Sequence, residues 1–304
     1  MAQKEYTLLG ESLLSYKGAA FALQHFENGI PETLEYLDSL KNFHVRDGDV
    51  FIMTFPKSGT IWMQYIVSIL YENDHPDLLE KPTHVQYVCP GWSTSGRLIT
   101  WTQGSLPGCC AHICQSTWLL WDYRATEPNY VTRNPKDVLV SYFHFSQVFK
   151  TLETADNLDE VLEHFLSGKI LGGNWFDHVE GWLNNKDKYD ILFVSYEEMK
   201  LDLRSVVMKI SKFVGKILSD VDVDKVMDRV TFKNMKNDPI ANYHSSVKGN
   251  LFDSSKGNFM RKGAVGDWKN FLTVAQSERF DQVYRERMKR LPLKVIWDLK
   301  ELHE

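Results

Sequence analysis

The segment 56–60 (PKSGT) combines residue types that bind phosphate groups. Lys57 supplies a full positive charge, and the hydroxyl groups of Ser58 and Thr60 are hydrogen-bond donors. Gly59 lets the main chain pass close to an anion. An apolar run precedes the segment and a helical pattern follows it, and the free N–H groups at a helix start also favour anions. The pattern predicts phosphate binding, and an ordinary strand-to-helix turn is the alternative.

The composition narrows the classes of protein that fit. The 304 residues include 35 Lys and Arg against 40 Asp and Glu, which gives a formal net charge of −5. A mildly acidic chain is a poor binder of nucleic acid through bulk charge, so the predicted phosphate site must be local. The absence of a long uninterrupted apolar run predicts no membrane span, and the N-terminus has no secretory pattern. The segment 56–60 also lacks the P-loop pattern, which disfavours a nucleotide kinase, an ATPase or a GTPase.

The elements that position these residues alternate β-rich runs with helical periods. This alternation predicts an α/β fold with a central parallel sheet flanked by helices, and we expect a single domain over residues 1–304. Residues 240–266 are polar and contain glycine, which predicts a loop. The expected strands are 50–55, 129–132 and 190–195, and the expected helices are those that begin near residue 60, span 159–168 and 175–183, end near 215, and span 274–290.

Three separated motifs resemble those of the cytosolic sulfotransferases. TFPKSGTIW (54–62) resembles the family's 5′-phosphosulfate loop, RNPKDVLVSYFHF (133–145) its 3′-phosphate segment, and FMRKGAVGDWKN (259–270) its C-terminal nucleotide segment. The C-terminal stretch resembles the amine-sulfotransferase branch in particular. The resemblance implies a P-loop-like strand, loop and helix that bind the phosphosulfate. It also implies a cytosolic enzyme of xenobiotic metabolism.

The activity implied by the resemblance is transfer of a sulfonate group from 3′-phosphoadenosine 5′-phosphosulfate to a small phenol, alcohol or amine. It implies no metal, no nucleic-acid partner and no membrane. Lys57 would also be catalytic, because a cation there offsets the charge that develops during transfer. The resemblance assigns donor binding to Lys57, Ser58, Gly59, Thr60, Ile61, Trp62, Arg133, Ser141, Tyr196, Thr231, Phe232, Met235, Phe259, Met260, Arg261, Lys262 and Gly263.

Several of these residues also have a purely structural interpretation. For Arg133 the alternative is a surface ion pair with Asp137, which would be the preferred interpretation without the motif. Arg261 and Lys262 fit a solvated basic loop. The rings of Trp62 and Phe232 fit core packing as well as stacking on adenine.

The general base is the part of the family pattern that this chain lacks. Family members carry a histidine in an [ST]-H-L-P stretch about twenty residues before the arginine of R-N-P-K-D, and the corresponding tetrapeptide is absent here. His112 lies 21 residues before Arg133 and is the candidate base. Two alternatives stay open: the base is lost and the protein is a catalytically impaired nucleotide-binding homologue, or residues 89–128 come from a shifted frame or a different exon.

The segment 89–128 is unusual in composition. It contains all four cysteines, Cys89, Cys109, Cys110 and Cys114, and no lysine occurs from 82 to 135. The spacing of these cysteines around His112 lacks the paired pattern of zinc sites, which favours free thiols.

Two further features complete the sequence interpretation. Lys269 to Glu278 resembles the family's short K-x₃-T-V-x₃-E dimer motif, which predicts a homodimer, and an ordinary loop before a capped helix is the alternative. His144 and His178 lie on amphipathic helical patterns and are interpreted as structural.

Overall fold

The computed structural model describes most of the chain. The described residues are 6–16, 19–22, 34–35, 50–72, 74, 109–110, 128–150, 152–239, 241–242, 252–253 and 255–302. Within these ranges no helix is long and apolar enough to cross a bilayer.

A four-stranded parallel sheet in the order β5-β4-β6-β7 forms the centre of the fold. Its strands β4, β6 and β7 correspond to the three expected strands, and β4 is buried along its whole length. Apolar runs of this kind are typical of parallel strands that are covered on both faces. The strands are β4 (Val50–Thr54), β5 (Cys109–Cys110), β6 (Pro128–Thr132) and β7 (Leu192–Ser195).

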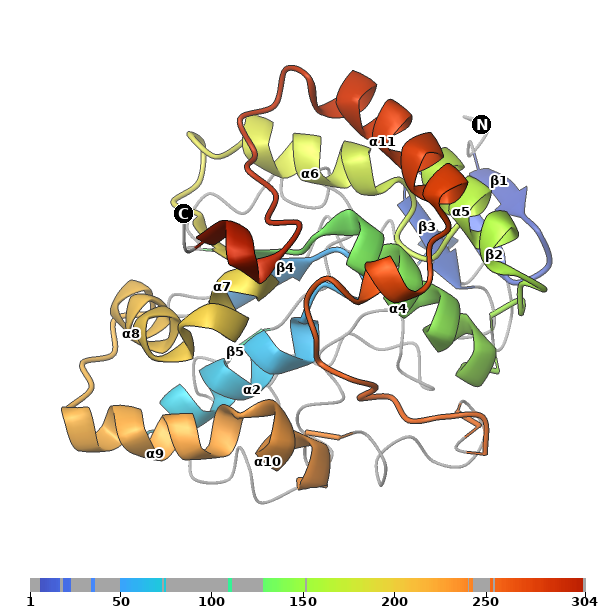
Figure 1. The fold of residues 1–304 in the computed structure, drawn as a ribbon. Coiled ribbons are helices and arrows are strands. Elements are labelled where there is room, and N and C mark those ends of the chain that lie inside the picture. Colours follow the sequence, from blue (N-terminus) through green and yellow to red (C-terminus); the bar gives the residue numbers. More distant parts are fainter. Residues whose placement is uncertain are drawn as a thin grey trace.

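Helices cover the sheet with two separate apolar cores. One core joins the sheet to α2, α7, α8 and α9, and the other joins α4, α5, α6 and α11. In Figure 1, α2, α7, α8 and α9 lie in the lower left part of the view. Helix α11 runs beside α6 at the top. The helices are α2 (Thr60–Leu70), α4 (Pro135–Val148), α5 (Leu158–Ser167), α6 (Trp175–Asn184), α7 (Tyr196–Leu201), α8 (Leu203–Phe213), α9 (Asp220–Val230), α10 (Phe232–Asn237) and α11 (Val274–Met288), with the 3-10 helices η4 (Asp267–Asn270) and η5 (Leu299–Leu302).

The helix boundaries follow local capping chemistry. Asn134 caps α4 by accepting the Lys136 N–H, and a proline occupies the first turn. Thr273 and Gln276 form a capping box at the start of α11. Because these signals are local, the expected helices 159–168, 175–183 and 274–290 agree with α5, α6 and α11 to within two residues.

A second sheet was absent from the sequence prediction. Strands β1 (Tyr6–Leu9), β2 (Leu13–Tyr16) and β3 (Ala19–Ala22) form an antiparallel meander. Each strand has only four residues, too few for periodicity to separate it from a loop. Of the predicted loop 240–266, the described residues include no helix or strand.

Candidate functional site

A cavity opens where strands β4, β6 and β7 end and the helices after them begin, the edge at which open parallel sheets bind ligands. It is lined by all the residues that the resemblance assigned to donor binding except Ser58 and Thr231, and by two more. The lining residues are Pro56, Lys57, Gly59, Thr60, Ile61, Trp62, Arg133, Ser141, Tyr196, Phe232, Met235, Phe259, Met260, Arg261, Lys262, Gly263 and Ala264.

The loop between β4 and α2 is a tight turn. The Ser58 N–H donates to the Phe55 carbonyl at 3.1 Å, and Lys57 adopts a left-handed backbone with φ of 72°. Such a conformation is costly for a residue other than glycine and persists only where its surroundings enforce it. The hydroxyl groups of Thr54 and Thr60 share a buried hydrogen bond of 2.5 Å that closes the two ends of the loop. The turn therefore holds Lys57 at a defined place in the cavity wall.

Two glycines allow close packing of aromatic rings against this cavity. Gly59 has φ of 107°, and a Cβ atom there would lie 2.9 Å from the Tyr196 ring. Gly263 has φ of 62°, and a Cβ atom there would overlap the Phe232 ring. Only glycine suits both the backbone angle and the space at each position.

Arg133 joins the first and third motifs. Its guanidinium donates to the Lys57 carbonyl at 2.9 Å and to the Ala264 carbonyl at 3.4 Å. It also lies 4.1 Å from the centre of the Tyr196 ring. The residue is only 9% exposed, and its Nε atom is buried with no hydrogen-bond partner among the described residues. The surface ion pair with Asp137 is therefore wrong as an account of Arg133.

Lys57 is a buried cation in a positively charged environment. Burial, together with the positive charges of Arg133 and Arg261, lowers the pKa of Lys57 to about 7. Its ammonium lies 4.1 Å from the centre of the Phe145 ring and 4.5 Å from that of Phe259. No carboxylate pairs with this ammonium within the part of the chain that the structure describes.

The cations of the third motif share one carboxylate. Asp267 pairs with Arg261 at 2.6 Å and with Lys262 at 3.0 Å. Although burial opposes its ionisation, hydrogen bonds from Asn270, Lys262 and Arg261 lower the pKa of Asp267 to about 2. Asp267 therefore stays charged and holds both cations at the rim of the cavity.

Aromatic side chains line the rest of the cavity. Trp62 donates its indole N–H to the Val230 carbonyl at 2.8 Å and packs edge-on against Tyr196. Phe145 contacts Lys57 and was not assigned from the sequence. A signal for it existed, because it lies one helical turn after Ser141 and so faces the same way from α4. Trp62 is 7% exposed and both packs in the core and lines the cavity.

Two of the residues assigned to donor binding do not line the cavity. Ser58 is fully buried behind the cavity, and its hydroxyl has no hydrogen-bond partner in the described part of the chain. Thr231 is the N-cap of α10 and accepts the Asn234 N–H with its hydroxyl. His112 lies outside the described residues, as do Cys89 and Cys114.

For the described residues, no cluster of three or more His, Cys, Asp or Glu side chains has the geometry of a metal site.

The two other histidines singled out from the sequence lie in packed surroundings. The Nδ1 atom of His178 shares a 2.9 Å hydrogen bond with the Tyr130 hydroxyl inside the core. His144 packs edge-on against Phe271 with ring centres 4.8 Å apart, and burial lowers its pKa.

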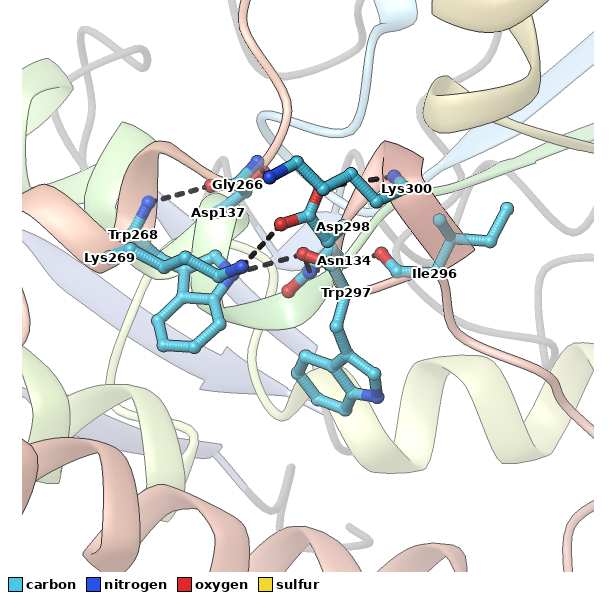
Figure 2. Close-up of polar contacts among 9 residues, drawn as sticks. All are labelled: Asn134, Asp137, Gly266, Trp268, Lys269, Ile296, Trp297, Asp298 and Lys300. Atoms are coloured by element: carbon cyan, nitrogen blue, oxygen red, sulfur yellow. Dashed lines mark hydrogen bonds and ion pairs between the residues drawn. The ribbon is translucent and has the colours of Figure 1, made fainter. Parts of the chain in front are cut away.

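The turn after β6 also anchors the C-terminal part of the chain. The side-chain amide of Asn134 donates to the carbonyls of Ile296 and Trp297 at 3.1 and 3.4 Å. Figure 2 shows Asn134 and these two carbonyls close to Asp137. The carboxylate of Asp137 points toward the backbone at Gly266. Residues 133–137 thus contact the first motif, the third motif and the C-terminal segment.

Comparison with known proteins decides the family. The sulfotransferase domain family matches residues 47–115 and 129–292. The chain belongs to the sulfotransferase family. It is an enzyme that transfers a sulfonate group to an acceptor. The matched ranges include His112 and leave out 116–128, which lie inside the compositionally unusual segment.

Individual relatives agree over nearly the full length. The chain is 41% identical to the amine sulfotransferase of Oryctolagus cuniculus over 95% of both chains. It is 34% identical to sulfotransferase 1C2 of Homo sapiens over 91% of this chain and 96% of that one. Among solved structures, mouse sulfotransferase SULT7A1 complexed with PAP matches with a TM-score of 0.72 and 27% identity, covering 92% of this chain and 95% of the other.

Proposed function

We propose that the cavity around Lys57 binds 3′-phosphoadenosine 5′-phosphosulfate, the sulfonate donor of this sulfotransferase. The loop 56–60 and the start of α2 hold the 5′-phosphosulfate. Arg133, Ser141 and the segment 261–263 hold the 3′-phosphate. The adenine stacks in the aromatic part of the cavity, where base stacking contributes about 1–3 kcal/mol.

One observation carries this proposal: four basic side chains line the cavity, and among the described residues Asp267 is the one carboxylate that forms an ion pair with any of them. Lys57 has no carboxylate partner in the described chain, and Arg133 and Arg261 lower its pKa further. Bringing like charges together in a buried site costs free energy unless an anion occupies it. A ligand with two separate phosphate groups supplies charge at both places where the cations gather. The bisphosphate PAP, which is present in the structure of the mouse relative, has this chemistry.

The transfer step uses Lys57 and a base. The acceptor oxygen or nitrogen attacks sulfur, and the bond from sulfur to the 5′-phosphate oxygen breaks. The electron pair of that bond leaves with the phosphate as adenosine 3′,5′-bisphosphate, and Lys57 offsets the charge that develops there. The acceptor proton passes to a base, for which His112 is the candidate by sequence position.

The acceptor is a small phenol, alcohol or amine, and the likeness to an amine sulfotransferase makes amines the first choice. The enzyme acts in the cytosol. The segment 269–278 mediates a homodimer, which the 76% exposure of the apolar Val274 supports.

Calorimetry with adenosine 3′,5′-bisphosphate tests the donor site directly. We expect saturable binding and a rise in thermal stability that follows ligand concentration. Transfer of labelled sulfonate to a panel of amines and phenols then identifies the acceptor class. If the bisphosphate binds no more tightly than inorganic phosphate, the assignment of the cavity is wrong. If the bisphosphate binds but no acceptor is sulfonated, the donor site stands and the acceptor classes are wrong.

A further inference from the structure

The third phosphate-binding segment needs an external support. In residues 255–266 the backbone forms neither helix nor strand, so no regular hydrogen bonding fixes the position of Arg261 and Lys262. Both cations pair with Asp267, which lies in the same segment. That pairing sets the cations relative to each other, but it leaves open what sets the segment relative to the rest of the site.

Asp137 supplies this support from α4. One of its carboxylate oxygens accepts the Gly266 N–H at 2.7 Å, and the other accepts the Trp268 N–H at 3.0 Å. Figure 2 shows the carboxylate facing these two backbone groups. The side chain is 2% exposed, so water does not compete for the two bonds. The two bonds hold the backbone at Gly266, which has φ of 77°, and two residues after it.

The carboxylate is kept buried at a cost that neighbouring groups offset only in part, because the pKa of Asp137 is raised overall. Burial raises the pKa of Asp137, as does the negative charge of Asp267, while Arg133 and the two backbone N–H groups lower it. Asp137 lies in the first turn of α4, four residues after Arg133, which comes directly before the N-cap Asn134. The segment that carries Arg261 is thereby tied to the turn that carries Arg133.

We propose that Asp137 is a positioning residue for the 3′-phosphate of the donor. It acts through the backbone of residues 266–268 and holds Arg261, Lys262 and Gly263 opposite Arg133. This inference rests on the proposed function, because it concerns the same site. It extends that function by assigning the 3′-phosphate selectivity partly to a residue that does not line the cavity.

Asp137→Asn tests the inference with almost no change in shape. The amide oxygen accepts only one of the two N–H groups, and the amide nitrogen faces the other as a second donor. A hydrogen bond to a charged group contributes enough that its loss weakens binding by roughly ten-fold. We therefore expect affinity for adenosine 3′,5′-bisphosphate to fall roughly ten-fold, and affinity for adenosine 5′-phosphate to stay within about two-fold. The donor KM should rise while kcat at saturating donor changes little.

Asp202→Asn is the matched control. Asp202 also accepts a backbone N–H, that of Ser205, where it caps α8 away from the cavity. The control should leave both nucleotide affinities unchanged. Equal weakening of the two nucleotides by Asp137→Asn, or no weakening of either, would overturn the inference. If wild-type protein bound neither nucleotide, the proposed function itself would be wrong.

Amide hydrogen exchange of the wild-type protein provides a second measurement that does not depend on folding of the variant. We expect the amides of Gly266 and Trp268 to be protected before any nucleotide is added. Exchange of both at the rate of unprotected loop amides would contradict the role of Asp137, since the bonds that define it would not persist in solution.

Discussion

The guanidinium of Arg133 donates a hydrogen bond of 2.9 Å to the main-chain carbonyl of Lys57, a residue 76 positions away. The bond joins the ends of two neighbouring parallel strands, β4 and β6. It leaves the Lys57 ammonium free to face the cavity, and it orients the arginine toward the same space. Two cations are therefore held close together by the fold, and the consequences of that arrangement can be measured.

Lys57→Met should stabilise the nucleotide-free protein while it removes most of the gain on ligand binding. The thioether fits between the Phe145 and Phe259 rings without a buried charge. Removing a penalty of about 1 kcal/mol raises the unfolding midpoint by roughly 1–2 °C in a protein of 304 residues. Differential scanning fluorimetry with and without adenosine 3′,5′-bisphosphate measures both effects. Lys225→Met, in an exposed ion pair with Asp222, is the control and should change neither.

The effect of Lys57→Met on stability should depend on pH in a defined direction. The pKa of Lys57 in the folded protein, about 7, lies below its ordinary value of 10.5. Between these two values the unfolded chain binds a proton that the folded protein does not, so the wild type gains stability as pH rises. The advantage of the variant is therefore largest at pH 6 and shrinks toward pH 10. An advantage that is constant over this range would show that Lys57 does not titrate there.

Nucleotide binding at pH 8 should take up protons. Most Lys57 side chains are neutral at that pH in the free protein, since their pKa is about 7. A bound phosphosulfate or phosphate anion favours the charged form and raises that pKa. Calorimetric heats measured in two buffers of different ionisation enthalpy should therefore differ for wild type. They should agree for Lys57→Met, and equal wild-type heats would refute the coupling.

Arg133→Lys should weaken binding of adenosine 3′,5′-bisphosphate by roughly 10–100-fold, although it keeps the charge. A single ammonium cannot bond two carbonyls and a phosphate in the geometry that the planar guanidinium provides. The loss should be smaller for adenosine 5′-phosphate, which lacks the group that Arg133 is proposed to hold. Titration of both nucleotides by fluorescence quenching compares the two. A uniform loss would place Arg133 outside the 3′-phosphate site.

His112→Ala should lower kcat by at least about 100-fold and leave the affinity for adenosine 3′,5′-bisphosphate unchanged, because a general base contributes to proton transfer and not to donor binding. Steady-state transfer of labelled sulfonate to an amine gives kcat, and calorimetry gives the affinity. His164→Ala, on the partly exposed end of α5, is a control that should retain activity. Full activity in His112→Ala would mean that another group accepts the proton.

Val274→Glu should convert a dimer into a monomer. Val274 begins α11 next to its N-cap Thr273 and is 76% exposed in the single chain. A charge placed there would be buried in the proposed contact and would repel its copy across a two-fold axis. Sedimentation velocity of wild type and variant gives the result. Identical wild-type and variant masses would argue against the segment 269–278 as the interface.

The local features of the chain could be predicted because their causes are local. The strand before Pro56, the turn at Gly59 and the helix after it follow from apolar runs, positive-φ positions and capping residues within a few positions of each other. The same holds for α5, α6 and α11. The motifs 54–62, 133–145 and 259–270 contain most of the residues that line the cavity, because the residue types proposed to bind phosphate are recognisable in sequence.

The tertiary structure alone decided which partner each of these residues takes. The sequence left open a surface ion pair between Arg133 and Asp137, yet Asp137 bonds to backbone groups about 130 positions away. Ser58 is buried in the core, whereas the Phe145 ring lies against the ammonium of Lys57. Sequence spacing sets which side chains can share one face of an element. The packing of the helices on the sheet determines which buried acceptor lies next to which donor. Those pairs form because burial penalises every polar atom left without a partner.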